Sequence, residues 1–294
     1  LWVMSSDFEE DVRISDDILK QVSEVYRKVR NTFRFMLGNV ADFNPEEDAV
    51  AYDDLYEIDQ FMYQRFNEVI NMVRDCYERY DYVTVYQSLQ NFINVDLSNF
   101  YLDYGKDILY IEKEDASIRR SIQTVLYKIL TDLNKLLAPI LVHTTEEIYQ
   151  HTPHTEKESV HLEYLPEVAE VDTELVGKWQ YFLKVRDDVY RALEVARNEK
   201  VIGKSLEAKV FVTEPEEMKF DDLHGNLEQL FIVSQVEVVD SLEDGTKYDT
   251  VTVKVEHAEG ERCERCWNFS TAESLTSGED DICPRCRTVV DSLS

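Results

Sequence analysis

The strongest chemical signal in the amino-acid sequence is a pair of C-x2-C motifs near its C-terminus. Cys263 and Cys266 form the first motif, and Cys283 and Cys286 form the second after sixteen intervening residues. This spacing allows four thiolates to close a tetrahedron around one ion, each about 2.3 Å from a zinc. We therefore predict one structural Zn2+ with no open coordination position. An iron site of the rubredoxin kind is the chief alternative, and disulfides would require an oxidising compartment.

The metal would supply most of the folding energy of this knuckle, because about 35 residues cannot bury a useful core alone. Within it, Arg265 and Trp267 flank the second cysteine. An indole and a guanidinium on such a turn suit contact with unpaired bases. The alternative is that Trp267 packs inward as the small core of the knuckle, and the sequence leaves both interpretations open. The fifth cysteine, Cys76, falls on an apolar helix face and is expected to be a core residue.

A second candidate site is basic. Arg27, Lys28, Arg30 and Arg34 lie within eight residues that contain no acid, in a chain of net charge −29. They would form a phosphate-binding face on one helix. Alternatively, they would complement the dipole at the C-terminal end of that helix. A further basic group is weaker because acids dilute it; its members are Arg197, Lys200, Lys204 and Lys209.

The remaining sequence offers no catalytic constellation. No GxGxxG, P-loop, GxSxG or HExxH motif occurs. His151 and His154 have a possible ligand spacing, but no partner at zinc spacing completes a site, so a solvated loop is expected. On these residues alone the chain is a binding module rather than a catalytic one.

Composition limits the fold and the partners. With 44% hydrophobic residues the chain can bury a sizeable core, and its 14 glycines and prolines, about 5% against a usual ~12%, favour long helices. Its longest apolar run, 136–142, is far shorter than the roughly 20 residues of a membrane span. Since 60 acids outnumber 31 lysines and arginines, a nucleic acid must meet a local basic patch. The chain starts at Leu1 without signal-peptide features, and we expect it to be part of a longer protein.

Helical periodicity dominates the first two thirds of the chain. Ser15 is a candidate N-cap and Gly38 a candidate stop for the first helix, and Thr144 with Glu147 has the pattern of a capping box. Apolar spacing predicts helices over 15–38, 55–80, 82–93, 116–137, from 144 onward, and 172–200. Segments rich in β-formers follow at 208–213, 228–239 and 248–255. The fold class predicted is mainly α: a helical bundle, then a small α/β domain, then the four-cysteine zinc knuckle.

Several segments resemble one family in the right order along the chain. They are LWVMSSDFEEDVRISDDILKQVSEVYRKVRNTFRFMLGN (1–39), NVDLSNFYLDYGKDILY (94–110), LLAPILVHTTEEIY (136–149), IGKSLEA (202–208), and ERCERCWN with CPRC. Together they resemble the C-terminal half of the class I isoleucyl-tRNA synthetases of the bacterial type. The valyl and leucyl enzymes share the helical domain but lack the terminal knuckle.

The resemblance implies a division of the chain into parts. These are a connection from the catalytic domain (1–14), a helical anticodon-binding domain (15–171), a connecting helix (172–203), a small α/β junction domain (204–256) and a zinc knuckle (257–294). The HIGH and KMSKS motifs of the class are absent, as is anything resembling the editing domain. The chain alone is therefore expected to be inactive, with ATP and Mg2+ acting only in the complete enzyme.

The resemblance also implies a partner, tRNAIle, bound through the anticodon stem-loop by a cytoplasmic, monomeric protein without DNA or membrane partners. It favours Arg27, Lys28, Arg30, Arg34, Arg265 and Trp267 as RNA contacts. Two alternatives remain. One is a DNA glycosylase of the formamidopyrimidine type, which ends in a similar knuckle but needs an N-terminal Pro-Glu and is usually basic. The other is a zinc-stabilised helical interaction module that does not bind RNA.

Overall fold

The computed structural model describes residues 1–7, 10–278 and 280–293. These residues form two compact units. The first unit contains residues 1–55, 59–105 and 114–172, and the second contains 56–58, 106–113 and 173–294. Two helices contribute residues to both units, so the units are interleaved along the chain. The main-α fold class with a small sheet and a C-terminal cysteine cluster is confirmed.

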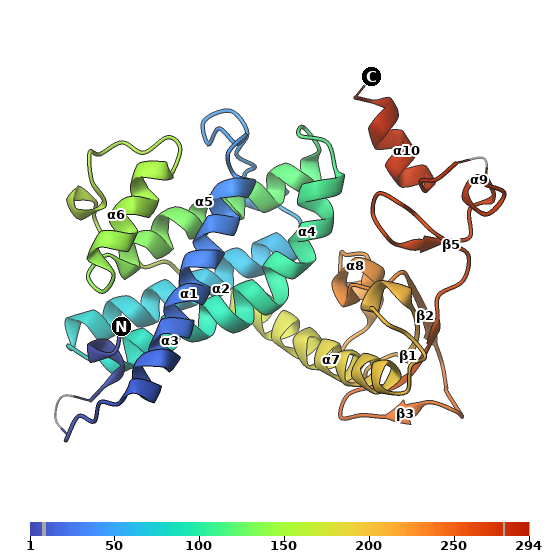
Figure 1. Cartoon of the computed structure of the whole chain (residues 1–294), viewed down its shortest axis with the longest axis horizontal. Helices are drawn as coiled ribbons and strands as arrows, with labels where there is room; N and C mark the ends of the chain where they lie inside the picture. Colours follow the sequence, from blue (N-terminus) through green and yellow to red (C-terminus); the bar gives the residue numbers. More distant parts are fainter. Residues whose placement is uncertain (8–9, 279, 294) are drawn as a thin grey trace. The chain divides into compact units, whose positions relative to one another are not determined.

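The first unit is a bundle of helices (Figure 1). Its elements are α1 (Asp16–Asn39), α2 (Glu57–Glu78), α3 (Tyr82–Asn91), α5 (Ser117–Leu137) and α6 (Val142–His151), with 3-10 turns at Val3–Ser5, Tyr52–Asp54 and Val160–Leu162. α1 packs against both α5 and α6. Buried apolar residues recur every three or four positions along α5, as its periodicity predicts.

The helix predicted over 82–93 is longer than expected. α3 continues through a π-helical segment, η3 (Phe92–Tyr101), into α4 (Leu102–Ile111). Residues 92, 93, 96, 97, 100 and 101 are the buried ones in η3. These positions step by three and four, which is ordinary helical spacing, so the predicted end at residue 93 is wrong because the helix continues in π-helical form to Tyr101.

The predicted helix ends are partly right. Ser15 caps α1 by accepting the backbone N–H three residues later at 3.3 Å, as predicted. The predicted stop at Gly38 is wrong, because the helix ends one residue beyond it. The capping box at Thr144 and Glu147 is also wrong: α6 begins two residues earlier, and Glu147 instead binds the Arg30 guanidinium.

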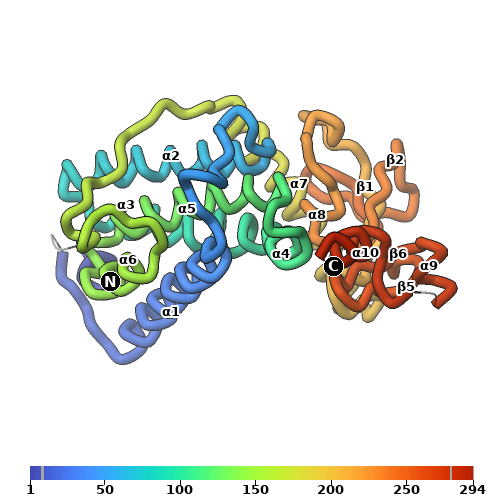
Figure 2. Tube along the Cα trace, turned by 90° about the horizontal axis from the view of Figure 1, so that it is seen from above, coloured from blue at the N-terminus to red at the C-terminus, as the bar shows by residue number. Residues whose placement is uncertain are grey.

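The extended segment 164–172, which follows the helices of the first unit, runs back along α2 (Figure 2). Arg74 donates to the carbonyl oxygen of Pro166 at 2.7 Å, and the Asn71 side chain exchanges two hydrogen bonds with the backbone of Ala169. These side-chain contacts satisfy backbone groups that have no strand partner.

The second unit contains α7 (Thr173–Asn198) and a four-stranded sheet. The strands are β1 (Ala208–Thr213), β2 (Gln235–Val239), β3 (Thr246–Lys247) and β4 (Thr252–His257), in the order β2-β1-β4-β3. β1 and β2 are parallel, and the other pairs are antiparallel. The predicted β segment at 228–239 is only half strand, because α8 (Leu227–Phe231) occupies its first part and forms the crossover, with a 3-10 turn at Phe220–Asp222.

The core of this unit lies between α7 and the sheet. The Phe182 ring stacks on Phe231 at 5.6 Å, and Trp179 is fully buried beside them. Trp179 Nε1 donates to Glu57 at 2.9 Å, which satisfies the polar atom of the buried indole. Three further residues, Ala208, Val210 and Val212, alternate inward along β1.

The C-terminal part of the second unit holds short elements only. They are the hairpin strands β5 (Glu261–Arg262) and β6 (Phe269–Ser270), and the helices α9 (Glu273–Thr276) and α10 (Pro284–Asp291). A 3-10 turn at Ser205–Glu207 precedes the sheet. Among the helices that the structure describes, none combines the length and apolarity needed to cross a bilayer.

A buried carboxyl group joins three helical segments of the first unit. Asp59 on α2 accepts hydrogen bonds from Tyr101 Oη at 2.6 Å and from Ser121 Oγ at 2.5 Å. No cation pairs with it in the described part of the chain. Burial raises its pKa to about 7, against the opposing effect of the two hydroxyl donors.

We predict that Asp59→Asn removes a pH dependence of stability. The unfolded carboxyl titrates near 3.8 and the folded one near 7, so the folded state binds more protons between these values. The free energy of unfolding therefore falls as pH rises through this window, by about 4 kcal/mol at most. Denaturant unfolding at pH 5, 6, 7 and 8 checks this: the variant gains on the wild type as pH rises. Asp17→Asn, an exposed position on α1, is the control. Parallel pH curves for Asp59→Asn and the wild type would contradict the assignment.

Candidate metal centre and nucleic-acid interface

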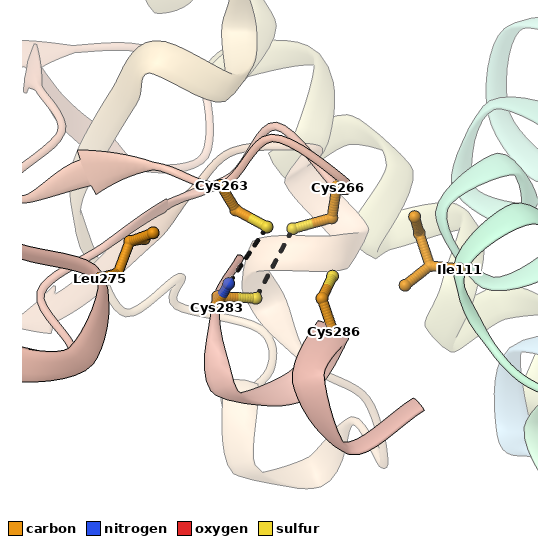
Figure 3. Close-up of a cluster of buried hydrophobic side chains, with 6 residues drawn as sticks. All are labelled: Ile111, Cys263, Cys266, Leu275, Cys283 and Cys286. Atoms are coloured by element: carbon orange, nitrogen blue, oxygen red, sulfur yellow. Dashed lines mark hydrogen bonds between the residues drawn. The ribbon is translucent and has the colours of Figure 1, made fainter. Parts of the chain in front are cut away.

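The four knuckle cysteines lie together in the structure. Cys263 and Cys266 sit on the turn between β5 and β6, Cys283 caps the N-terminus of α10, and Cys286 lies in its first turn. All four are buried, and their Sγ atoms lie within 4.8 Å of one another (Figure 3). Among the described residues there is no other such group of three or more potential ligands, and His151 and His154 belong to none.

The geometry of the cluster fits a tetrahedral zinc. Cys266 Sγ and Cys283 Sγ are 3.8 Å apart. A tetrahedron of sulfurs about 2.3 Å from the metal has edges of about 3.8 Å. This distance is far from a disulfide bond, and all the cysteines are free thiols, so the disulfide interpretation is wrong. Since sulfur fills all four positions, the site holds structure together and leaves no place for substrate.

Backbone donors prepare Cys263 for binding a cation. The backbone N–H of Cys283 donates to Cys263 Sγ at 3.2 Å. Burial raises the pKa of the Cys263 thiol, but hydrogen bonds from the backbone of Cys266, Cys283 and Arg265 outweigh it and bring the pKa down to about 7. Such donors stabilise the Cys263 thiolate, which is the form that binds metal, whereas burial raises the pKa of Cys286 to about 11 and also raises that of Cys266.

Trp267 is presented to solvent. Its side chain is 58% exposed, and the apolar residues packed with the cysteines are Leu275, Ile282 and Ile111. The interpretation of Trp267 as the small core of the knuckle is therefore wrong. Its backbone has φ +66°, an uncommon conformation for a bulky residue. Its N–H donates to the Cys263 carbonyl at 2.9 Å, which closes the C-x2-C turn and holds this conformation.

Arg265 lies differently from Trp267. Its guanidinium is partly buried, and Nη2 donates to the main-chain carbonyl of Ile111, at the end of α4, at 2.8 Å. The exposed arginine of this hairpin is Arg262 on β5, which has no ion pair among the described residues. Arg262 was not among the contacts predicted from the sequence. In a strand, neighbouring side chains point to opposite faces, so an inward Cys263 predicts an outward Arg262.

The basic residues of α1 share one face. Arg27, Arg30 and Arg34 are exposed, at positions that repeat by three and four. The buried residues Val29 and Phe33 lie on the opposite face of the helix. The last turn of α1 contains no basic residue, so the interpretation of this cluster as cations at the helix C-terminus is wrong.

Acidic neighbours neutralise two of the four basic residues. Arg27 Nη1 pairs with Glu24 at 2.9 Å. Arg30 makes a bidentate pair with Glu147 of α6, with both distances 2.9 Å, and lowers the pKa of that carboxyl. Lys28 and Arg34 have no ion pair within the described ranges, so Arg34, which is exposed, is the most available cation of the group.

Two members of the weaker basic group are neutralised, while Lys200 and Lys204 are exposed and have no ion pair among the described residues. Arg197 pairs with Glu194 within α7, and Lys209 on β1 binds two glutamates, Glu237 and Glu259. Neutralised in this way, these two cations offer little attraction to a polyanion.

Two family models match the chain. One is described as the anticodon-binding domain of tRNA ligase and matches residues 59–212, and the other as a zinc finger found in FPG and IleRS and matches residues 260–289. The chain is similar to the isoleucine--tRNA ligases of Staphylococcus carnosus (59% identical over 296 residues) and Staphylococcus aureus strain MSSA476 (57% over 301 residues), with all of the chain covered. That of Macrococcus caseolyticus is 58% identical over 99% of the chain. The chain spans 32% of the length of each of these relatives.

We predict that Cys283→Ser removes the metal. The chain should bind about one zinc, and loss of one ligand leaves three sulfurs that cannot close the tetrahedron. Structural zinc contributes on the order of 10 kcal/mol to so small a unit, so the last ~35 residues should lose protection from hydrogen exchange. The helical first unit should keep its melting transition. Metal analysis on protein purified without chelator gives the stoichiometry, with Cys76→Ser as the control. A Cys283→Ser protein with a full complement of zinc would refute the site.

Proposed function

We propose a tRNA-binding function from the premise that this chain belongs to the anticodon-binding domain family of tRNA ligases. More specifically, we propose that it recognises the anticodon stem-loop of tRNAIle. In the whole protein this recognition would place the tRNA so that a catalytic domain attaches isoleucine with ATP and Mg2+. The identity to isoleucine--tRNA ligases along the whole chain supports this choice of amino acid.

The observation that carries the proposal is the exposed indole of Trp267. Trp267 follows the first two cysteines and precedes β6, and its backbone has a left-handed conformation. The residue has 58% of its surface exposed. An uncommon backbone conformation that survives in a protein often marks a functional position. A flat, exposed ring on a fixed turn is a suitable platform for an unpaired base of an anticodon loop.

Charge supports a divided role for the remaining candidates. Because the chain carries −29, RNA must approach where cations remain unpaired. Arg34 and Lys28 on α1 meet this condition for phosphates of the stem, whereas Arg27 and Arg30 would have to leave their carboxylates first. In the knuckle we propose a supporting part for Arg265, which fixes the turn that carries Trp267.

We also infer that the cluster of four cysteines holds one structural zinc, that the chain is a monomer, and that it acts in the cytoplasm, where aminoacylation of tRNA takes place. The glycosylase alternative is weaker, although the knuckle model covers both groups. It leaves the match of residues 59–212 to the anticodon-binding model without an explanation. The interaction module without RNA is tested by the binding experiments below.

We predict that Trp267→Ala weakens binding to tRNAIle roughly 5- to 150-fold, the range expected for one stacked base at about 1–3 kcal/mol. Zinc content and thermal stability should stay near wild type because the indole is not packed in the knuckle. Fluorescence titration of the complete 294-residue chain against tRNAIle and a tRNA of another specificity measures the effect. Tyr164→Ala, which removes another exposed aromatic ring, is the matched control. Release of zinc from Trp267→Ala would show a structural role instead, and unchanged affinity would exclude stacking.

We predict that Arg34→Ala weakens tRNA binding with little dependence on tRNA sequence. The slope of log affinity against log salt should decrease by about one, the signature of one lost phosphate contact. Lys20→Ala on the same helix is the matched control, since Lys20 lies near Asp17 at 3.7 Å. Titrations at four salt concentrations separate the two possibilities. A salt-independent loss for Arg34→Ala would mean that the residue acts through folding.

A further inference from the structure

Two arginines of the knuckle reach the same end of α4. Each immediately precedes the second cysteine of its C-x2-C motif, as Arg265 before Cys266 and Arg285 before Cys286. Arg285 pairs with Asp107 at 2.7 Å through Nη1 and with Glu112 at 2.8 Å through Nε. As described above, Arg265 binds the Ile111 carbonyl. Residues 106–113 and the knuckle belong to the same compact unit, so these contacts form within it.

The end of α4 in turn covers the metal site. The Ile111 side chain is 7% exposed and packs with the four cysteines, on the side of Cys266 and Cys286 (Figure 3). Only two other apolar residues in the described knuckle, Leu275 and Ile282, join this cluster. A residue about 150 positions earlier in the sequence therefore supplies part of the apolar shell that keeps water from the sulfurs.

We propose that the knuckle is a metal-dependent clasp on the C-terminal end of α4. The bound metal holds the two C-x2-C turns together, and only then do Arg265 and Arg285 grip the helix end at the same time. Ile111 completes the clasp by shielding the cysteine cluster. Arg265 and Arg285 are thus positioning residues, and the clasp is independent of whether RNA binds.

The metal is needed because few other contacts join the two turns that carry the arginines; one is the hydrogen bond from the Glu264 N–H to the Asp281 carbonyl at 3.0 Å. Twenty positions separate them in sequence, and the apolar cluster is too small to order the knuckle alone. The hairpin has a separate attachment, in which the Phe269 N–H donates to Ser234 Oγ at 2.8 Å. This attachment involves no cysteine turn, so it should survive metal loss while the grip on α4 fails.

Asp107 explains why the grip is sensitive to a single change. Its carboxylate pairs with Arg285 and also accepts a hydrogen bond from Gln229 of α8 at 3.1 Å. The knuckle and the crossover helix thus hold the same acidic side chain. Loss of the arginine would leave this partly buried carboxylate without its cation, which is costly.

The first test measures release of zinc to a chelator that reports metal colorimetrically. Ile111→Ala and Arg265→Ala should each speed release by roughly 10- to 100-fold, the usual effect of changing residues that surround metal ligands. Arg262→Ala is the matched control for Arg265, because it removes an exposed arginine of the same hairpin. Ile14→Ala, at an exposed isoleucine, is the control for Ile111. Release rates of Ile111→Ala and Arg265→Ala equal to those of their controls would overturn the shielding role.

The second test measures hydrogen exchange of residues 106–113 in the complete chain with and without metal. Removal of zinc and Arg285→Gln should each speed exchange roughly ten-fold, and the two together should do little more than either alone. Glu112→Gln gives the same measurement from the helix side should Arg285→Gln fail to fold. The clasp would be overturned if the effects of metal removal and Arg285→Gln on the exchange rate were additive, or if metal removal left the exchange rate unchanged. Neither readout contains RNA, so failure of the clasp and failure of tRNA binding are distinguishable.

Discussion

The knuckle depends on one constraint, that four sulfur atoms from two separate turns must lie within 4.8 Å of one another. Bringing four thiolates this close without a cation would concentrate negative charge in a buried space. A metal converts that repulsion into the main source of order for a segment with almost no apolar core. The exposed Trp267, the inward Arg265 and the α4 contacts of Arg285 all follow from where the two turns are held.

Electrostatics in the helical unit work by selective neutralisation. An acidic chain has enough carboxylates to pair with every cation. Arg27 pairs with an acid of its own helix, and Arg30 pairs with an acid of α6. Among the described residues, Arg34 on the same face has no such pair. A polyanion therefore meets a small positive field inside a repulsive one, which favours recognition of a particular place and orientation over non-specific binding.

The sequence predicted well those features that depend on local spacing. Two C-x2-C motifs sufficed for the metal cluster, and apolar periodicity sufficed for α1, α2, α5 and α7. It failed where long-range contacts decide. Glu147 has the position of a capping residue but binds Arg30, which lies 117 residues earlier. The predicted end of the third helix at residue 93 is also wrong, because the helix continues through a π-helical segment whose buried residues keep helical spacing. The direction of Arg265 depends on a carbonyl 154 residues away, which no local pattern contains.

The place of Ile111 beside the cysteines has a consequence for how this protein can be divided or recombined. The knuckle is contiguous in sequence, but its apolar lining is not, since one wall comes from the end of α4. A knuckle grafted alone onto another scaffold would arrive with a hydrophobic gap over its metal ligands and two arginines without partners. In a chimera between relatives, residues 106–113 and the segment from 257 onward should be exchanged together. Across such relatives, substitutions at these two places should be correlated, because each is the other's packing surface.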